Sequence, residues 1–129
     1  MRHASDGKDR GSVAVEFALV LPILATLLIG VIEFGNAYGA QLAVTNAARE
    51  AARTMAVQNS VSAAQTAALT AAQALRAPAM TAAQVTVSPA SCSAGTTATV
   101  TIRYPFAFLT GYFGAGFTMT GKAAMQCGG

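Results

Sequence analysis

The chain has 129 residues, of which 53% are hydrophobic and only 10% are charged, and its formal net charge is +3. Its basic residues are scattered and no basic run is interleaved with aromatic residues, so nucleic-acid binding has little support. Much of the hydrophobic fraction is alanine, which fills little core volume. With a membrane span subtracted, about 90 residues remain, enough for one small domain at most.

Residues 1–11 are polar and show no apolar periodicity. They include Arg2, Lys8 and Arg10, and no further Lys or Arg follows until Arg49. Because cytoplasmic segments next to a span are enriched in Lys and Arg, this asymmetry favours an N-terminus inside the cell. We expect residues 1–11 to be a disordered leader that stays in the cytoplasm.

An apolar stretch from Gly11 to Ile32 organises the rest of the chain. Its uncharged part, 17–32, makes a helix of about 24 Å, short of the roughly 30 Å hydrocarbon core. A helix over 12–32 reaches about 31 Å, so we predict a transmembrane helix there. This assignment places Glu16 inside or at the edge of the apolar layer, where an ionisable residue is a candidate functional residue. The alternative is a cleaved secretory signal, which the missing A-x-A cleavage pattern disfavours.

Pro22 lies inside the predicted span. It removes one backbone donor and clashes with the carbonyl four residues earlier, so a helix kink near 18–22 is predicted. Helical character continues over 33–58, so both parts can form one long helix ending at Asn59-Ser60. That segment carries an apolar stripe at Phe34, Tyr38 and Leu42. A second, thinner stripe comprises Val44, Ala48, Ala51, Ala52 and Met55.

The remaining sequence predicts a second helix and a small sheet. Residues 61–75 are alanine-rich, with Ser62 as a possible cap and Ala77-Pro78 as the stop. The period then changes to two, which predicts strands over 85–87, over 96–104 as far as Pro105, and over 117–126. A glycine- and aromatic-rich loop, 106–117, separates the last two strands. The fold class is therefore α+β, with a long transmembrane and amphipathic helix, an alanine-rich helix and about three antiparallel strands.

The only cysteines are Cys92 and Cys127. If the strands pair antiparallel, both lie at the same end of the sheet, which fits a disulfide formed in an oxidising compartment. Two buried thiols are the alternative.

No catalytic set is found in the sequence. The only histidine is His3, so no base is available to activate a serine or threonine nucleophile. Neither a phosphate loop nor a metal motif occurs. We therefore expect no enzymatic activity, no cofactor, no bound metal and no small-molecule substrate.

The stretch Gly11-Ser12-Val13-Ala14-Val15-Glu16-Phe17 has a specific pattern: a polar leader ends in glycine, a glutamate follows five residues later, and an apolar helix begins. This pattern resembles the type IV pilin processing site, which a prepilin peptidase cuts after the glycine. From Gly11 to Arg53 the sequence resembles the TadE-like pseudopilins of the tight-adherence, or Flp pilus, systems. A TadF-like or TadG-like subunit is the nearest alternative.

This resemblance implies cleavage after Gly11, with Ser12 as the new N-terminus. It also implies subunit assembly through Glu16 and Phe17, and an extracytoplasmic pilin-like domain over 33–129. The implied location is the bacterial inner membrane, crossed once. The implied partners are the peptidase, other pilin-like subunits and the tight-adherence secretion machinery.

From the residues themselves, the new α-amino group would be cationic and Glu16 of a neighbouring subunit could pair with it. The alternative is that Glu16 has no pairing role and its side chain only extends to the cytoplasmic interface of the membrane. A different hypothesis for the whole chain is an unprocessed single-span protein. Its outer domain would bind a partner or ligand through the aromatic loop that carries Tyr112.

Overall fold

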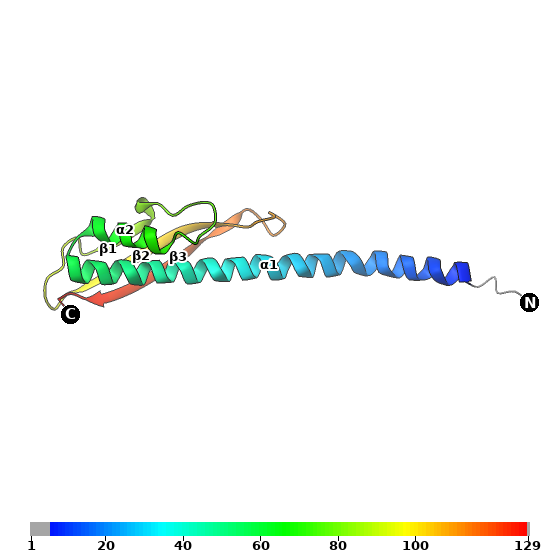
Figure 1. The fold of residues 1–129 in the computed structure, drawn as a ribbon, viewed down its shortest axis with the longest axis horizontal. Helices are drawn as coiled ribbons and strands as arrows, with labels where there is room; N and C mark the ends of the chain where they lie inside the picture. Colours follow the sequence, from blue (N-terminus) through cyan, green and yellow to red (C-terminus); the bar gives the residue numbers. More distant parts are fainter. Residues whose placement is uncertain (1–5, 129) are drawn as a thin grey trace, which may run out of the picture. The chain divides into compact units, whose positions relative to one another are not determined.

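A computed structural model describes residues 6–128, except for the side chain of Asp6. The predicted α+β class is confirmed: a long apolar helix is followed by a second, short helix and a three-stranded antiparallel sheet (Figure 1). The chain divides into two compact units, one ending at Gly35 and one beginning at Asn36. Each unit is described on its own below.

Helix α1 (Asp6–Gln58) is longer than predicted at its start. The expectation of a disordered leader is wrong for residues 6–11, which are helical, and Met1–Ser5 lie outside the described residues. Extending an existing helix needs no new nucleus, so polar residues can join one that is already formed. Helix α1 ends at Gln58, as predicted. Asn59 follows it with φ of 49°, and its amide donates a hydrogen bond to the Met55 carbonyl at 2.9 Å.

Helix α2 (Val61–Ala71) begins as predicted and ends four residues earlier than expected. Its cap is Ser60 and not Ser62, because Ser60 has extended backbone angles and its hydroxyl accepts a hydrogen bond from the Ala63 amide at 3.2 Å. A short 3₁₀ helix, η1 (Ala82–Gln84), leads from α2 to the sheet.

The sheet contains β1 (Val85–Ser88), β2 (Thr97–Ala107) and β3 (Gly116–Gln126) in the order β1-β2-β3. Pro105 was predicted to end the second strand, but β2 continues to Ala107. The register explains this difference. Strand β1 pairs only with residues 99–102 of β2, so no β1 backbone lies opposite Pro105, and its missing N–H breaks no bond to that strand.

The core of the second unit lies between α1 and one face of the sheet, and small side chains dominate its helical side. The predicted stripe from Val44 to Met55 is buried, whereas Tyr38 and Leu42 of the other stripe are exposed. The sheet contributes the inward residues of β2 that alternation predicted, with Val100, Ile102 and Tyr104 buried. Alanine on the helix permits close approach of the two layers.

Gly121 of β3 marks a close approach between helix and sheet. A Cβ atom built on Gly121 would lie 2.7 Å from Val44 Cγ1 and 2.8 Å from the Val44 carbonyl oxygen. One residue earlier, the Thr120 carbonyl accepts a hydrogen bond from Gln41 Nε2 at 3.1 Å. The backbone of β3 therefore lies directly on α1, and only glycine fits at position 121.

Candidate functional site

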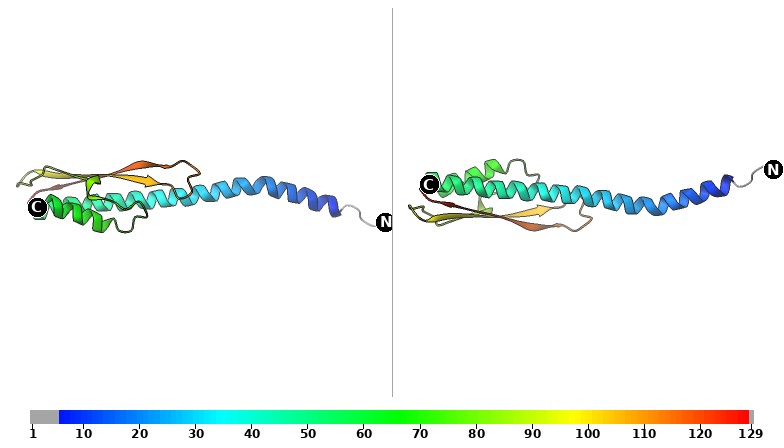
Figure 2. Two further views of the ribbon diagram at one scale, coloured as in Figure 1. Left: turned by 90° about the horizontal axis from the view of Figure 1, so that it is seen from above. Right: turned by 90° about the horizontal axis from the view of Figure 1, so that it is seen from below.

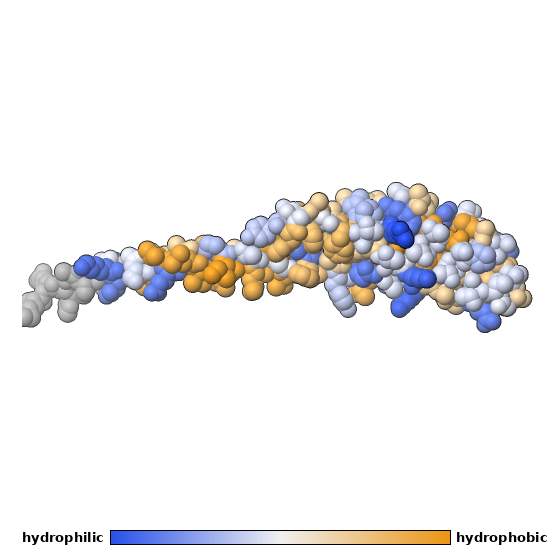
Figure 3. All heavy atoms as spheres, turned by 180° about the vertical axis from the view of Figure 1, so that it is seen from behind, coloured by the Kyte–Doolittle hydropathy of each residue, from blue (hydrophilic) through white to orange (hydrophobic). Residues whose placement is uncertain are grey.

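The apolar part of α1 before Gly35 is exposed along its length. Twelve large apolar side chains between Val13 and Ile32 are exposed: Val13, Val15, Phe17, Leu19, Val20, Leu21, Ile23, Leu24, Leu27, Leu28, Val31 and Ile32. Figure 3 shows them as an orange band that follows a bluer, polar start of the helix. Soluble monomers rarely expose a continuous apolar surface of this extent. The helix is long and apolar enough to cross a membrane, and the most apolar part of it is unburied.

Gly11 and Ser12 lie within α1 and are both exposed. A Cβ atom built on Gly11 would meet no other atom within 4 Å, and the same holds for Gly7 in the preceding turn. The predicted processing site is therefore not packed against other parts of the described chain. A methyl group at either glycine fits without displacing anything.

Glu16 lies four residues after Ser12, which corresponds to about 6 Å of rise on the same face of a helix. Its carboxylate is exposed, and Phe17 beside it is 63% exposed. Glu33 differs, because it is the one charged side chain that is buried among the described residues. No buried side-chain oxygen or nitrogen in that part of the chain lacks a hydrogen-bond partner.

Pro22 lies inside α1, which continues through it. Its nitrogen has no hydrogen to donate to the Ala18 carbonyl, while its own carbonyl accepts a hydrogen bond from Thr26 Oγ1 at 2.8 Å. Pro22, Ile23, Thr26 and Leu27 line a shallow hollow of about 400 Å³ on the helix surface. The kink expected at Pro22 stays a prediction.

The two cysteines of the second unit form a disulfide, Cys92–Cys127, with a Cα–Cα distance of 5.6 Å. Backbone bonds hold the end of β3 on both sides. The Cys127 amide donates to the Thr96 carbonyl at 2.8 Å, and the Gly128 amide donates to the Ala56 carbonyl at 3.4 Å. The segment before the first cysteine is also held, because the Cys92 amide donates to Asn59 Oδ1. The disulfide therefore joins the end of β3 to the turn between β1 and β2, beside the end of α1.

Tyr104 is a structural residue to which the sequence analysis assigned no role. Its ring is buried, and its hydroxyl lies 2.9 Å from the Arg76 carbonyl and 2.6 Å from the Pro78 carbonyl, to which it can donate. Burial raises the pKa of the Tyr104 hydroxyl, because the phenolate would lose its hydration. This hydroxyl ties the segment after α2 to the sheet.

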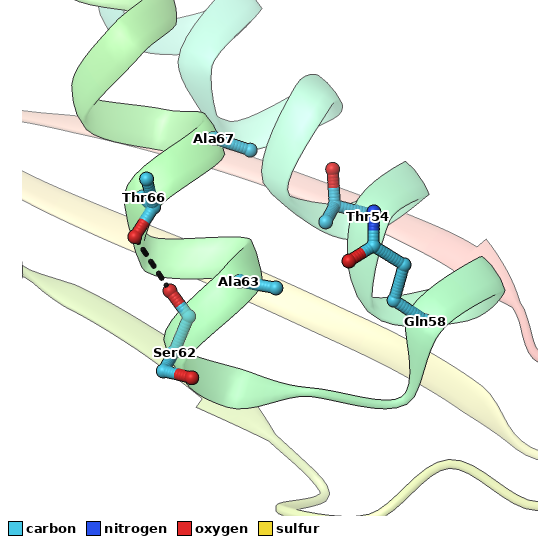
Figure 4. A pocket seen from close by; sticks show the side chains of 6 residues that line it. All are labelled: Thr54, Gln58, Ser62, Ala63, Thr66 and Ala67. Atoms are coloured by element: carbon cyan, nitrogen blue, oxygen red, sulfur yellow. Dashed lines mark hydrogen bonds between the residues drawn. The ribbon is translucent and has the colours of Figure 1, made fainter.

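A hollow of about 420 Å³ in the second unit is lined by residues of α1 and α2. Figure 4 shows its six lining side chains, which are those of Thr54, Gln58, Ser62, Ala63, Thr66 and Ala67. Thr66 Oγ1 donates to the Ser62 carbonyl at 2.9 Å, and Thr54 Oγ1 donates to the Glu50 carbonyl at 2.9 Å. The threonine hydroxyls are thus bound to their own helices and do not converge on a ligand. Among residues 6–128, no three His, Cys, Asp or Glu side chains gather where they could hold a metal ion.

Together these features are those expected of a single-pass membrane protein with a small α+β domain. Residues 11–53 match the family described as TadE-like protein, which confirms the predicted resemblance over this segment. The match begins at the predicted processing glycine. It ends before α2, the sheet and the disulfide. No curated protein and no solved structure matches the chain.

Proposed function

We propose that this chain is a membrane-anchored minor pseudopilin required for assembly of a tight-adherence, or Flp, pilus. One observation carries the proposal: Gly11, Glu16 and an exposed apolar helix occur together at the start of the TadE-like segment. The role is structural and not enzymatic. A prepilin peptidase cuts after Gly11, and Ser12 becomes the N-terminus of the mature chain.

The chemistry of the new N-terminus gives Glu16 a role. Cleavage creates an α-amino group at Ser12, whose ordinary pKa of about 7.7–8.0 leaves it largely cationic at neutral pH. Placing an unpaired charge in an apolar layer carries a desolvation cost, and this holds for the Ser12 ammonium group and for the Glu16 carboxylate. The two costs are offset only if the two groups form an ion pair. Pairing the Ser12 amine with Glu16 of a neighbouring subunit satisfies both groups. It also fixes the axial position of one helix against the next.

The proposed location is the inner membrane of a bacterium, with residues 1–11 in the cytoplasm, 12–32 across the membrane and 33–129 outside the cytoplasm. Lys8 and Arg10 before the span support this orientation. The disulfide Cys92–Cys127 supports an oxidising compartment for the second unit. The proposed partners are the peptidase, other pilin-like subunits and the tight-adherence secretion machinery.

A matched pair of glycine variants tests this function. Because neither glycine is packed, Gly11→Ala and Gly7→Ala should both leave the fold intact. In the host envelope we expect Gly7→Ala to be processed like the native chain. We expect Gly11→Ala to keep its leader and to abolish pilus assembly. Equal processing of the two variants would exclude cleavage directed by Gly11.

An unprocessed single-span protein is the alternative, and the exposed aromatic side chains at the end of the β2–β3 hairpin favour it as a partner-binding module. Tyr112, Phe113 and Phe117 are 62%, 45% and 49% exposed. In that case Gly11→Ala would be without effect, while polar substitution of Tyr112 would remove the function.

A further inference from the structure

The β2–β3 hairpin ends in a cluster of aromatic rings, which we call the aromatic tip and define as Phe108, Tyr112, Phe113 and Phe117. The ring centroids of Phe108 lie 5.8 Å from Phe117 and 6.5 Å from Phe113, and Tyr112 lies 5.2 Å from Phe113. Phe106 is buried and joins this cluster to the core, with its ring 5.5 Å from Phe108. The tip is therefore an ordered continuation of the core that exposes large apolar side chains.

The aromatic tip lies in a segment that carries no charge. Between Arg103 and Lys122 the chain contains neither acidic nor basic residues. Edge and loop segments of soluble domains are normally protected by charged side chains, particularly lysine. An uncharged hairpin end with exposed Tyr and Phe has instead the composition found where membrane proteins meet the bilayer interface.

Contacts inside the second unit fix the end at which this tip lies. Gln41 bonds to Thr120, Val44 touches Gly121, and Ala56 bonds to Gly128, so β3 runs in the same direction as α1. The five residue steps from Gly116 to Gly121 span about 17 Å of strand, whereas the eight steps from Asn36 to Val44 span about 12 Å of helix. The hairpin therefore reaches at least as far as Asn36. Figures 1 and 2 show its turn at the end of the sheet opposite to the end of α1 at Gln58.

Chain connectivity brings that end of the unit close to the membrane. The proposed span ends at Ile32 and the second unit begins at Asn36. The four residue steps from Ile32 to Asn36 correspond to about 6 Å of helix, similar to the roughly 5–7 Å thickness of one headgroup layer. The covalent connection therefore keeps the Asn36 end of the second unit close to the bilayer, and the tip lies at that end of the unit.

From this placement, which rests on the membrane anchor of the proposed function, we infer that the aromatic tip is a second membrane contact. Tyr112, Phe113 and Phe117 insert into the outer headgroup layer, while the charged Arg103 and Lys122 stay above it. Its ligand is the lipid interface itself, with no requirement for an anionic headgroup. This contact holds the small domain against the bilayer.

Single-tryptophan fluorescence tests the inference, because the chain contains no tryptophan. The full chain is reconstituted in phosphatidylcholine vesicles whose acyl chains carry bromine at either a shallow or a deep position. Tyr112→Trp reports the tip, Leu24→Trp reports the span, and Val57→Trp, at a 70% exposed site near the end of α1, is the distal control. We expect a blue-shifted Tyr112→Trp emission that shallow bromines quench, deep quenching of Leu24→Trp, and water-like, unquenched emission from Val57→Trp.

The three probes separate the possible failures. Deep quenching of Leu24→Trp with water-like emission from Tyr112→Trp would overturn the inference and leave the anchor intact. A blue shift of Tyr112→Trp without quenching, growing with the protein-to-lipid ratio, would assign the tip to a second copy of the chain and also overturn it. An unquenched Leu24→Trp would contradict the anchor and this inference together. Cleavage after Gly11 is read separately by mass, so its failure does not affect the result.

Discussion

The helix–sheet contact at Gly121 makes the sharpest prediction about stability. In Gly121→Ala the new methyl carbon would lie 2.7 Å from Val44 Cγ1, 2.8 Å from the Val44 oxygen and 3.0 Å from the Val44 carbonyl carbon. Two of these three atoms belong to the backbone, so a change of rotamer cannot relieve the clash. Strand β3 and helix α1 must move apart by several tenths of an ångström. Overpacking of this kind costs about 1–3 kcal/mol.

Urea unfolding of the full chain in detergent micelles, followed by near-ultraviolet circular dichroism, measures the effect. With an m value of about 1–3 kcal/mol per molar urea, the midpoint should fall by roughly 1 M. Gly39→Ala is the matched control, because Gly39 lies inside α1 with nothing within 4 Å of its would-be Cβ. It should gain about 0.5–1 kcal/mol from helix propensity. A Gly121→Ala chain as stable as the native one would refute direct contact between the β3 backbone and α1.

Three further predictions concern the disulfide, Tyr104 and Glu16. Cys92–Cys127 closes a separation of 35 residues, and its reduction should lower the free energy of unfolding by roughly 3–4 kcal/mol in the chain-entropy account. The native chain should then show a lower urea midpoint when reductant is added. Reductant should not change the midpoint of a Cys92→Ser/Cys127→Ser chain. For Tyr104, burial raises the folded pKa above the unfolded value, so the unfolded state releases its proton first. Stability should fall as pH rises above about 10, and Tyr104→Phe should lose about 0.5–1.5 kcal/mol at neutral pH but show a shallower alkaline decline. Glu16→Gln should still be cleaved yet fail to crosslink with neighbouring pilin-like subunits, and unchanged crosslinking would remove its pairing role.

The sequence predicted the regular elements well because their periodicities are local. The period-two pattern over 96–104 correctly predicted a strand there, and helical spacing picked out the stripe from Val44 to Met55 as one of two apolar stripes on α1. Two stripes on α1 competed for the core, and helical spacing alone could not decide between them. The alanine stripe is the buried one because it lets the sheet backbone approach to contact.

The differences arise where tertiary context decides. Pro105 fails to end β2 because β1 is too short to reach it, and the length of a neighbouring strand is not encoded at the proline itself. Ser60 caps α2 in place of Ser62, because the backbone is still extended at Ser60 and its hydroxyl can therefore reach the Ala63 amide. Gly121 was a missed site. A lone glycine inside a strand pattern is a known indication of close backbone approach, and it was available in the sequence.

The most direct test of the central claim is the intact mass and N-terminal sequence of the protein purified from envelopes of its own host. The account predicts a mature chain that begins at Ser12, with Gly11 and everything before it removed. A chain that still begins at Met1 would contradict processing. It would leave a single-span anchor in which Glu16 has no amino group to pair with.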